Sequence, residues 1–282
     1  MNYENYIHQM TQLLKLKGCT EGTIKMYCQC IKKVLTALDK PVEDITTDDL
    51  MGYLHQMITL KCANSTINQN HSILNFFFSK VLRNPRIVDP IPYMRKVKKL
   101  PEILTPKEVS SIFKLSLNLK YKTIFMTIYA SGLRIGEVLR LKVSDIDSSK
   151  MQLYINQGKR KKDRYAILSK HNLDCLRDYY RVYKPDDLLF YAYSYKNRPM
   201  SKNTVEKEFK STLAAAGITK KVTPHSLRHA FASHLLENGT DIYTIKSLLG
   251  HSTLRSTEVY LQLSPSRVFS TKSPLDQESV YE

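Results

Sequence analysis

The chain has 282 residues, of which 42% are hydrophobic and 24% charged, a composition typical of folded proteins with room for two ordinary domains. Lys and Arg number 43 against 26 Asp and Glu, so the formal charge is +17 and a polyanion (DNA, RNA or an anionic membrane) is the expected partner. The sequence shows no apolar run near the roughly 18 residues that span a bilayer, no signal-peptide pattern and no CxxC pair among its five cysteines, which favours a cytosolic, reduced protein.

The positive charge is unevenly distributed along the chain. Residues 1–95 carry 11 basic and 8 acidic residues (+3), whereas residues 96–282 carry 32 and 18 (+14). A basic chain whose charge is concentrated in one domain favours a nucleic-acid partner, although a generally basic surface would give the same total.

Residues 3–82 are predicted to form four helices. Thr20-Glu21 begins a helix that runs to about Leu38 with apolar residues at helical spacing. Thr47-Asp48-Asp49 begins another, with acidic residues at its positive end, and a further helix begins at Asn64 or Ser65.

Residues 84–101 are predicted to be an extended connector, because four prolines remove backbone donors and fix φ there. The segment either lies along a phosphate backbone or is a solvated linker. Its candidate DNA-binding residues are Arg95, Lys96, Lys98 and Lys99.

A second domain is predicted to begin at Thr105, where Thr-Pro-Lys-Glu forms a capping box with proline at the first helical position. The rest predicts mainly helix with one small antiparallel sheet, so the fold class is mainly α, with two domains and a connector that could clamp a duplex. Helices are expected near 106–116, 120–131, 135–141, 170–183, 203–216, 226–238, 241–249 and 254–261; strands at 151–157 and 164–168, joined by a turn at 158–163; and a polar tail after Pro265.

Two arginines in different segments of this domain suggest a phosphate site. Cleaving a phosphodiester adds negative charge in the transition state, so fixed cations must lie where that charge develops. Arg134 and Arg228 could hold both non-bridging oxygens, because a guanidinium is planar, bidentate and always charged.

The remaining chemistry needs a nucleophile and proton carriers. A tyrosine such as Tyr260 is protonated at neutral pH and needs nearby cations or a base to react. His225 could accept its proton, His251 could donate to a phosphate oxygen, and Lys159, at the predicted hairpin tip, could protonate the leaving 5′-oxygen.

Together these segments resemble the tyrosine recombinases, or phage integrase family, which share a catalytic domain with type IB topoisomerases. Gly-Leu-Arg134-Ile-Gly-Glu matches the family's first arginine, His225-Ser-Leu-Arg228 its histidine and second arginine, and Leu-Gly-His251 its later histidine, with Tyr260 nine residues on. Lys159 falls where the family's hairpin lysine does, although Arg160, Lys161 and Lys162 share the same tip and are further DNA-binding candidates. Glu137 matches a supporting acidic residue.

The resemblance covers nearly the whole chain and implies its organisation. Residues 1–83 correspond to a helical core-binding (SAM-like) domain, 84–104 to a basic linker, and 105–282 to a catalytic domain whose tail, from about 265, would dock onto a neighbouring protomer. A short, Xer-like member without an arm-binding domain is implied. The family's mechanism uses a 3′-phosphotyrosyl intermediate, four protomers on two DNA sites, and neither metal, ATP nor another cofactor.

Each of these residues also has a structural explanation when taken alone. Arg134 could form a surface ion pair, Tyr260 could be one packing tyrosine among 18, and His225 could be a core histidine. His251 could simply follow a helix end, and the basic run 158–164 could be a solvated hairpin.

The combination, in family order, favours a site-specific recombinase that acts in mobile-element integration or excision, or in dimer resolution. Two alternatives stay open: a catalytically silent DNA-binding protein of the same fold, and a site-independent topoisomerase-like enzyme. A metal site is not expected, because His225 and His229 have ligand spacing but no carboxylate or cysteine cluster stands nearby. The DNA site, the biological role and any second recombinase or accessory factor are not specified by the sequence, and a cytoplasmic, nucleoid-associated location is expected.

Overall fold

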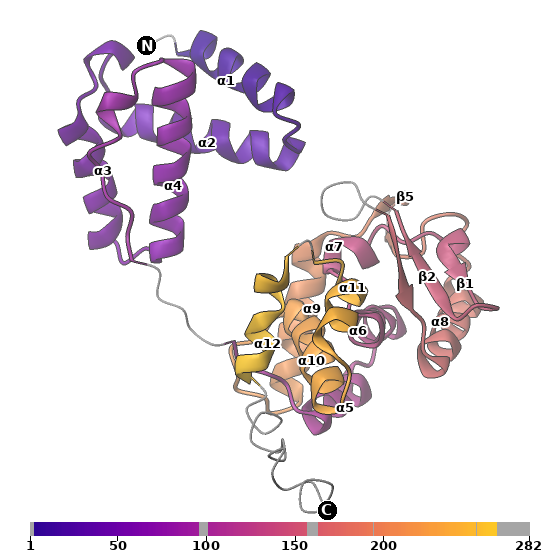
Figure 1. The fold of residues 1–282 in the computed structure, drawn as a ribbon. Coiled ribbons are helices and arrows are strands. Elements are labelled where there is room, and N and C mark those ends of the chain that lie inside the picture. Colours follow the sequence, from indigo (N-terminus) through magenta and orange to yellow (C-terminus); the bar gives the residue numbers. More distant parts are fainter. Residues whose placement is uncertain (1–2, 96–100, 157–162, 194, 252, 264–282) are drawn as a thin grey trace, which may run out of the picture. The chain divides into compact units, whose positions relative to one another are not determined.

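The computed structural model describes residues 3–95, 101–156, 163–193, 195–251 and 253–263. Its contacts divide the chain into two compact units, residues 1–99 and 100–282. Among the described residues, the first unit contains helices, and the second contains helices and two small sheets (Figure 1). None of the helices in the described ranges is both long and apolar enough to cross a membrane.

Two helices of the first unit, those that begin at Glu21 and Thr47, have side chains that cap their N-termini. Thr20 Oγ1 accepts a hydrogen bond from the backbone N–H of Thr23 at 3.4 Å. Thr46 and Asp49 form a reciprocal capping box, so the cap lies one residue before the predicted Thr47. The described elements are α1 (Glu4–Leu16), α2 (Glu21–Leu38), η1 (Val42–Asp44), α3 (Thr47–Thr59), α4 (Asn64–Phe76), the π-helical continuation η2 (Phe77–Val81) and η3 (Pro85–Ile87).

The core of the first unit extends into the segment that we predicted to be an extended connector. Val88 is fully buried and Ile91 nearly so. The Asn68 side chain bonds the backbone of Met94 twice, accepting from its N–H at 2.8 Å and donating to its carbonyl at 2.9 Å. The prediction was therefore wrong for residues 85–94, because burying the two apolar side chains outweighs the prolines' preference for open, extended chain.

The second unit is built around α6, which packs against α5, α7, α8, α9, α10 and β3. Thr105 and Glu108 form the predicted capping box with Pro106 at the first helical position. Predicted boundaries agree with the structure to within one or two residues for most helices. The described helices are α5 (Pro106–Leu115), α6 (Leu119–Ser131), α7 (Ile135–Val138), η4 (Val143–Asp145), α8 (Lys170–Tyr183), α9 (Lys202–Ala215), α10 (Pro224–Glu237), α11 (Ile242–Leu249), η5 (Leu254–Ser256) and α12 (Glu258–Leu263).

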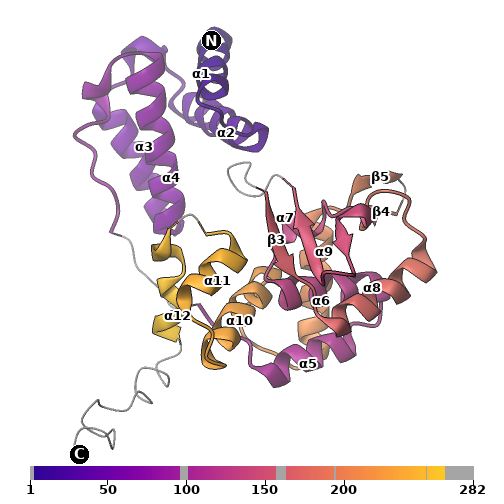
Figure 2. The same ribbon diagram turned by 45° about the vertical axis from the view of Figure 1, so that its right-hand side comes forward.

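An antiparallel sheet of three strands, in the order β1-β2-β3, covers one side of these helices (Figure 2). Strand β2 pairs with β3 in the register Leu153↔Ala166, which confirms the predicted hairpin. We did not predict the two-residue β1, or a second sheet of β4 and β5, because β1 is too short for alternation and every residue of β5 is exposed. The strands are β1 (Ile146–Asp147), β2 (Gln152–Ile155), β3 (Arg164–Ile167), β4 (Tyr191–Ala192) and β5 (Tyr195–Pro199).

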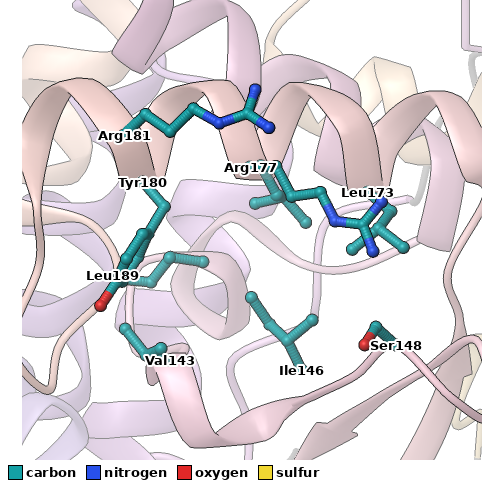
Figure 3. A pocket seen from close by; sticks show the side chains of 9 residues that line it. Val143, Ile146, Ser148, Leu173, Arg177, Tyr180, Arg181 and Leu189 are labelled. Carbon is teal, nitrogen blue, oxygen red and sulfur yellow. The ribbon is translucent and has the colours of Figure 1, made fainter.

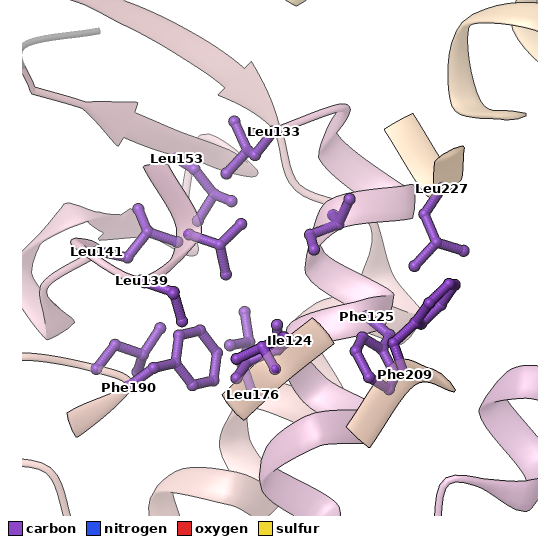
Figure 4. Packing of buried hydrophobic residues seen from close by; sticks show 14 of the residues in the cluster. Ile124, Phe125, Leu133, Leu139, Leu141, Leu153, Leu176, Phe190, Phe209 and Leu227 are labelled. Atoms are coloured by element: carbon purple, nitrogen blue, oxygen red, sulfur yellow. The ribbon is translucent and has the colours of Figure 1, made fainter. Parts of the chain in front are cut away.

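The core of the second unit lies between the sheet and the central helix α6. Phe125 of α6 meets Phe209 of α9 edge to face, with ring centroids 5.1 Å apart (Figure 4). Leu153 of β2 and Leu133, just before α7, are fully buried in the same cluster. The segment after α6, which begins the candidate site, is therefore anchored to the core.

Candidate active site

Gly132 ends helix α6 and places Arg134 at the start of α7. Its φ is +61°, and a Cβ there would lie 2.5 Å from the ring of Phe231 in α10, so only glycine fits. Arg134 precedes α7 with an extended backbone, and its N–H donates to Glu137 Oε2 at 2.8 Å. The turn from α6 to α7 thus fixes both residues against α10.

The carboxylate of Glu137 is the centre of the site's charge network. It is 5% exposed and accepts hydrogen bonds from Arg134 Nη1 at 2.8 Å and from Arg164 Nη1 and Nη2 at 3.0 and 2.8 Å. Arg228 Nη1 lies 3.8 Å from its Oε2. Burial works against the charged form, but the hydrogen bonds and charges of Arg164 and Arg134 hold the pKa of Glu137 at about 2.

Arg228 is the most deeply buried cation of this network. Its side chain is 1% exposed, and it donates from Nη1 to the Gly132 carbonyl at 2.6 Å and from Nη2 to the Leu249 carbonyl at 2.7 Å. Burial and the charge of Arg134 lower the pKa of Arg228 to about 9, so the guanidinium remains charged at neutral pH. The side chain therefore joins the ends of α6 and α11 and holds a positive charge between them.

His251 lies beside Arg228, at the end of α11. Its Nε2 is 3.0 Å from Arg228 Nη2, and its Nδ1 is 2.9 Å from Thr257 Oγ1. Because a guanidinium can only donate, Nε2 must accept and Nδ1 carries the proton. The sequence-based expectation that His251 donates to a phosphate needs Nε2 protonated instead, an arrangement that differs from the one seen.

Tyr260 of α12 lies in an apolar cluster that includes Phe231, Ile245 and Leu249. Its side chain is 2% exposed, and its hydroxyl is 3.0 Å from Nδ1 of His229. Burial raises the pKa of Tyr260, and the charges of Arg228 and Arg134 act in the opposite direction. The phenol is thus held protonated and in place, next to the two arginines.

The hydrogen-bond partner of Tyr260 is His229 and not His225, which we expected to take its proton. The rings of His225 and His229 lie edge to face, with centroids 4.7 Å apart. Loss of solvent and the charges of His225 and Arg228 lower the pKa of His229 to about 4, so it is neutral at pH 7. Burial and the charges of Arg228 and Arg134 also lower the pKa of His225.

Several residues predicted from the sequence cannot be placed in this site. Lys159, Arg160, Lys161 and Lys162 lie outside the described residues, as do Lys96, Lys98, Lys99 and the tail after 263. Arg95 is described and exposed, and its carbonyl accepts a hydrogen bond from Asn64 at 3.1 Å.

A pocket of about 440 Å³ lies away from this cluster, between α8 and the segment that leads into β1. Figure 3 shows Arg177 and Arg181 projecting from the helix along one side, with Val143 and Ile146 opposite. Both arginines form ion pairs within α8, with Asp174 and Asp178. None of the predicted site residues lines this pocket.

Sequence reasoning missed three residues that complete the described site: Arg164, His229 and Thr257. Arg164 was hidden in a basic run, and its position five residues after Lys159, at the start of β3, was the available clue. His229 was weighed only as a metal ligand, although one helical turn separates it from His225. The described site gathers three guanidiniums, three imidazoles and a phenol, which can bind a phosphate and hold a nucleophile beside it.

Family models match both units of the chain. The "Phage integrase family" model matches residues 102–267, and the "Phage integrase, N-terminal SAM-like domain" model matches residues 6–87.

Curated relatives are similar over most of their length. An integrase/recombinase of Sinorhizobium fredii, y4qK, is 42% identical over 270 residues, which cover 95% of this chain and 87% of the relative. The tyrosine recombinase XerA of Pyrococcus horikoshii is 30% identical over 268 residues, covering 92% and 89%.

Solved structures share the fold at lower identity. A lambda integrase dimer bound to a core site has a TM-score of 0.75 at 21% identity, covering 91% of this chain and 97% of that one. The XerH site-specific recombinase bound to its palindromic substrate has a TM-score of 0.73 at 19% identity, covering 93% and 82%.

Proposed function

The chain belongs to the phage integrase family and is a tyrosine site-specific recombinase, and we propose that Tyr260 is the nucleophile with which it cleaves and rejoins DNA. Arg134 and Arg228 bind the scissile phosphate, with Glu137 as their common support. The single observation that carries this assignment is that four distant segments bring Arg134, Arg228, His251 and Tyr260 into one connected cluster.

The proposed reaction exchanges one phosphoester for another. The Tyr260 oxygen forms a bond to phosphorus, the bond from phosphorus to the 5′-oxygen breaks, and the phenolic proton passes to a nearby base. Lys159 supplies a proton to the leaving 5′-oxygen. A 5′-hydroxyl of the partner strand then attacks the phosphorus of the 3′-phosphotyrosyl bond and gives its proton to Lys159, while Tyr260 leaves and takes its proton back from the base, so the number of phosphoester bonds is conserved.

The three histidines of the site divide into two tasks in this scheme. His251 is held against Arg228 and Thr257, which supports a place beside the phosphate oxygens. His225, the expected base, lies one helical turn from His229, which holds the Tyr260 hydroxyl in the described arrangement. We therefore assign proton removal to this histidine pair, with His229 as the group nearest the phenol.

The domain assignment is likewise a proposal. Residues 1–83 act as the core-binding domain, residues 84–104, of which 85–94 pack against the first unit, link it to the catalytic domain, and residues 105–282 carry the chemistry. The match of one family model to residues 6–87 and another to 102–267 supports this division. The basic residues of the link and of the 158–162 turn contact the DNA backbone.

We propose that four protomers assemble on two double-stranded DNA sites and that the tail from about 265 docks onto a neighbour. Solved structures of similar fold include a lambda integrase tetramer bound to a Holliday junction, which supports this assembly. A second recombinase or an accessory factor can join it. The protein acts on the nucleoid in the cytoplasm, in mobile-element movement or dimer resolution.

The test is a covalent adduct that depends on Tyr260. DNA recovered in covalent attachment to the protein in its host is sequenced to identify the site, and a nicked suicide substrate carrying it is incubated with purified protein. A denaturing gel should show an adduct with the wild type and none with Tyr260→Phe. Tyr243→Phe, an exposed tyrosine of α11, is the matched control and should cleave normally. An adduct that survives Tyr260→Phe, or no adduct with the wild type, would refute the proposal.

A further inference from the structure

Arg164 is a third arginine of the site that the proposed chemistry does not use. It stands at the start of β3, and its side chain, 12% exposed, reaches across to Glu137 in α7. Its two terminal nitrogens donate to the two carboxylate oxygens at 3.0 and 2.8 Å, in the parallel fork that guanidinium and carboxylate form when they match.

The contacts of Glu137 differ among its three arginines. Arg164 uses both terminal nitrogens for the carboxylate, whereas Arg134 uses Nη1 and its backbone N–H. Arg228 stays at 3.8 Å and spends its hydrogen bonds on the Gly132 and Leu249 carbonyls and on His251. The carboxylate is thus neutralised chiefly by Arg164, the arginine to which the proposed reaction gives no role.

We propose that Arg164 is a positioning residue that neutralises Glu137, so that this carboxylate does not draw the guanidiniums of Arg134 and Arg228 away from the scissile phosphate. This inference rests on the proposed function, because it concerns how the phosphate-binding arginines are positioned. Without Arg164, a buried carboxylate would have Arg134 and Arg228 as its nearest cations among the described residues. Arg228 would then close the 3.8 Å gap at the expense of its bond to Gly132.

A second contact ties Arg164 to the other side of the site. Its side chain lies over Gly250, where a Cβ would be 2.7 Å from Cδ and 2.9 Å from Nε. Gly250 ends α11 with φ +63° and is followed by His251. One side chain therefore sets the position of the Glu137 carboxylate and of the chain that presents His251.

The arrangement around Arg164 is not the one that stability alone would favour. Its Nε is buried without a hydrogen-bond partner among the described residues. Three guanidiniums around one carboxylate also leave net positive charge in a buried site, which is unfavourable until an anion enters. A phosphate would supply that anion, and Arg164 keeps the positive charge from being cancelled by Glu137.

The test separates neutralisation of Glu137 from simple support of the fold. Arg164→Met, Arg164→Lys and the double variant Arg164→Met with Glu137→Gln are compared with wild type. Arg181→Met is the matched control, because that arginine also pairs with a carboxylate, that of Asp178, but is exposed on α8. Single-turnover cleavage of the suicide substrate at saturating DNA, DNA affinity and thermal melting are measured for each.

We expect Arg164→Met to lower the cleavage rate constant by about 100-fold, as for loss of one preorganised donor, with DNA affinity nearly unchanged. The cleavage rate constant of Arg164→Lys should lie between those of the wild type and Arg164→Met, because lysine keeps the charge and loses the two-pronged contact. The double variant should cleave about tenfold faster than Arg164→Met, since no carboxylate remains to attract the other arginines. Arg181→Met should match wild type.

Two outcomes would overturn the inference while leaving the proposed function intact. In one, the wild type forms the adduct and Arg164→Met cleaves at the same rate. In the other, the double variant is no faster than Arg164→Met, as a purely structural role predicts. A wild type that forms no adduct would instead refute the proposed function, on which the inference rests.

Discussion

Gly250→Ala tests whether the packing of Arg164 over the chain before His251 matters for cleavage. At φ +63° an alanine costs about 1–2 kcal/mol relative to glycine. Its methyl group would also lie 2.7 Å from Arg164 Cδ, so the arginine must shift away from Glu137. Weakening that buried, charged pair adds about 1–3 kcal/mol. The total, about 3 kcal/mol, corresponds to a fall in the melting temperature of about 6–12 °C for a unit of this size.

Gly217→Ala is the matched control, because it shares the conformational cost without the clash. Gly217 also follows a helix, has φ +65°, and has no atom within 4 Å of a built Cβ. We expect it to lower the melting temperature by only about 2–8 °C and to leave the cleavage rate unchanged. Thermal melting and single-turnover cleavage, measured where both variants are folded, compare the two. Equal cleavage by Gly250→Ala and Gly217→Ala would refute the coupling of Gly250 to the site through Arg164.

Three further predictions follow from the same network. The pKa of His229 is about 4 in the folded protein, against 6.5 for a free histidine. As the pH falls below about 6.5, this histidine therefore binds a proton in the unfolded chain before it does so in the folded one, and the free energy of unfolding should drop toward pH 4. His229→Gln should reduce that acid loss of unfolding free energy, measured by urea titration at several pH values, and an identical pH dependence would contradict the assignment. Glu137→Gln should destabilise the protein by about 3–5 kcal/mol at pH 7, because it leaves buried arginines without their counter-charge; a change below 1 kcal/mol would argue against this. Thr257→Val removes the partner of His251 Nδ1 and should slow cleavage without changing DNA affinity; Thr253→Val, on an exposed residue of the same loop, is its control.

Much of the fold follows from local patterns that the sequence shows directly. The capping box at Thr105 and the glycine at 132 mark a helix start and a helix end because they act within a few residues. The β4–β5 hairpin could not be predicted, since exposed strands lack alternating burial. The burial of Val88 and Ile91 could not be predicted either, because it depends on packing against helices elsewhere in the first unit and not on a local pattern.

For the candidate site, the sequence indicated which residues take part but not which of them contact each other. The motifs around Arg134, Arg228 and Tyr260 indicate which groups are present, and the structure gathers them. Which groups touch is set by tertiary packing: the phenol meets His229, one helical turn beyond the expected histidine. Arg164 escaped because nothing in a basic run distinguishes the arginine that points inward from those that face solvent.

The burial of Tyr260 limits what this protein can attack with the nucleophile that we propose. The hydroxyl of a tyrosine that is 2% exposed and bonded to His229 cannot meet a phosphoester dissolved in water. Bringing the two together requires a rearrangement of the apolar cluster around α12, and the energy for it must come from contacts elsewhere on the substrate. A mononucleotide or a short diester offers too few such contacts, whereas a duplex offers many phosphates at once. Small metabolites are thereby excluded because the Tyr260 oxygen is inaccessible to them, with no need for a pocket that rejects them.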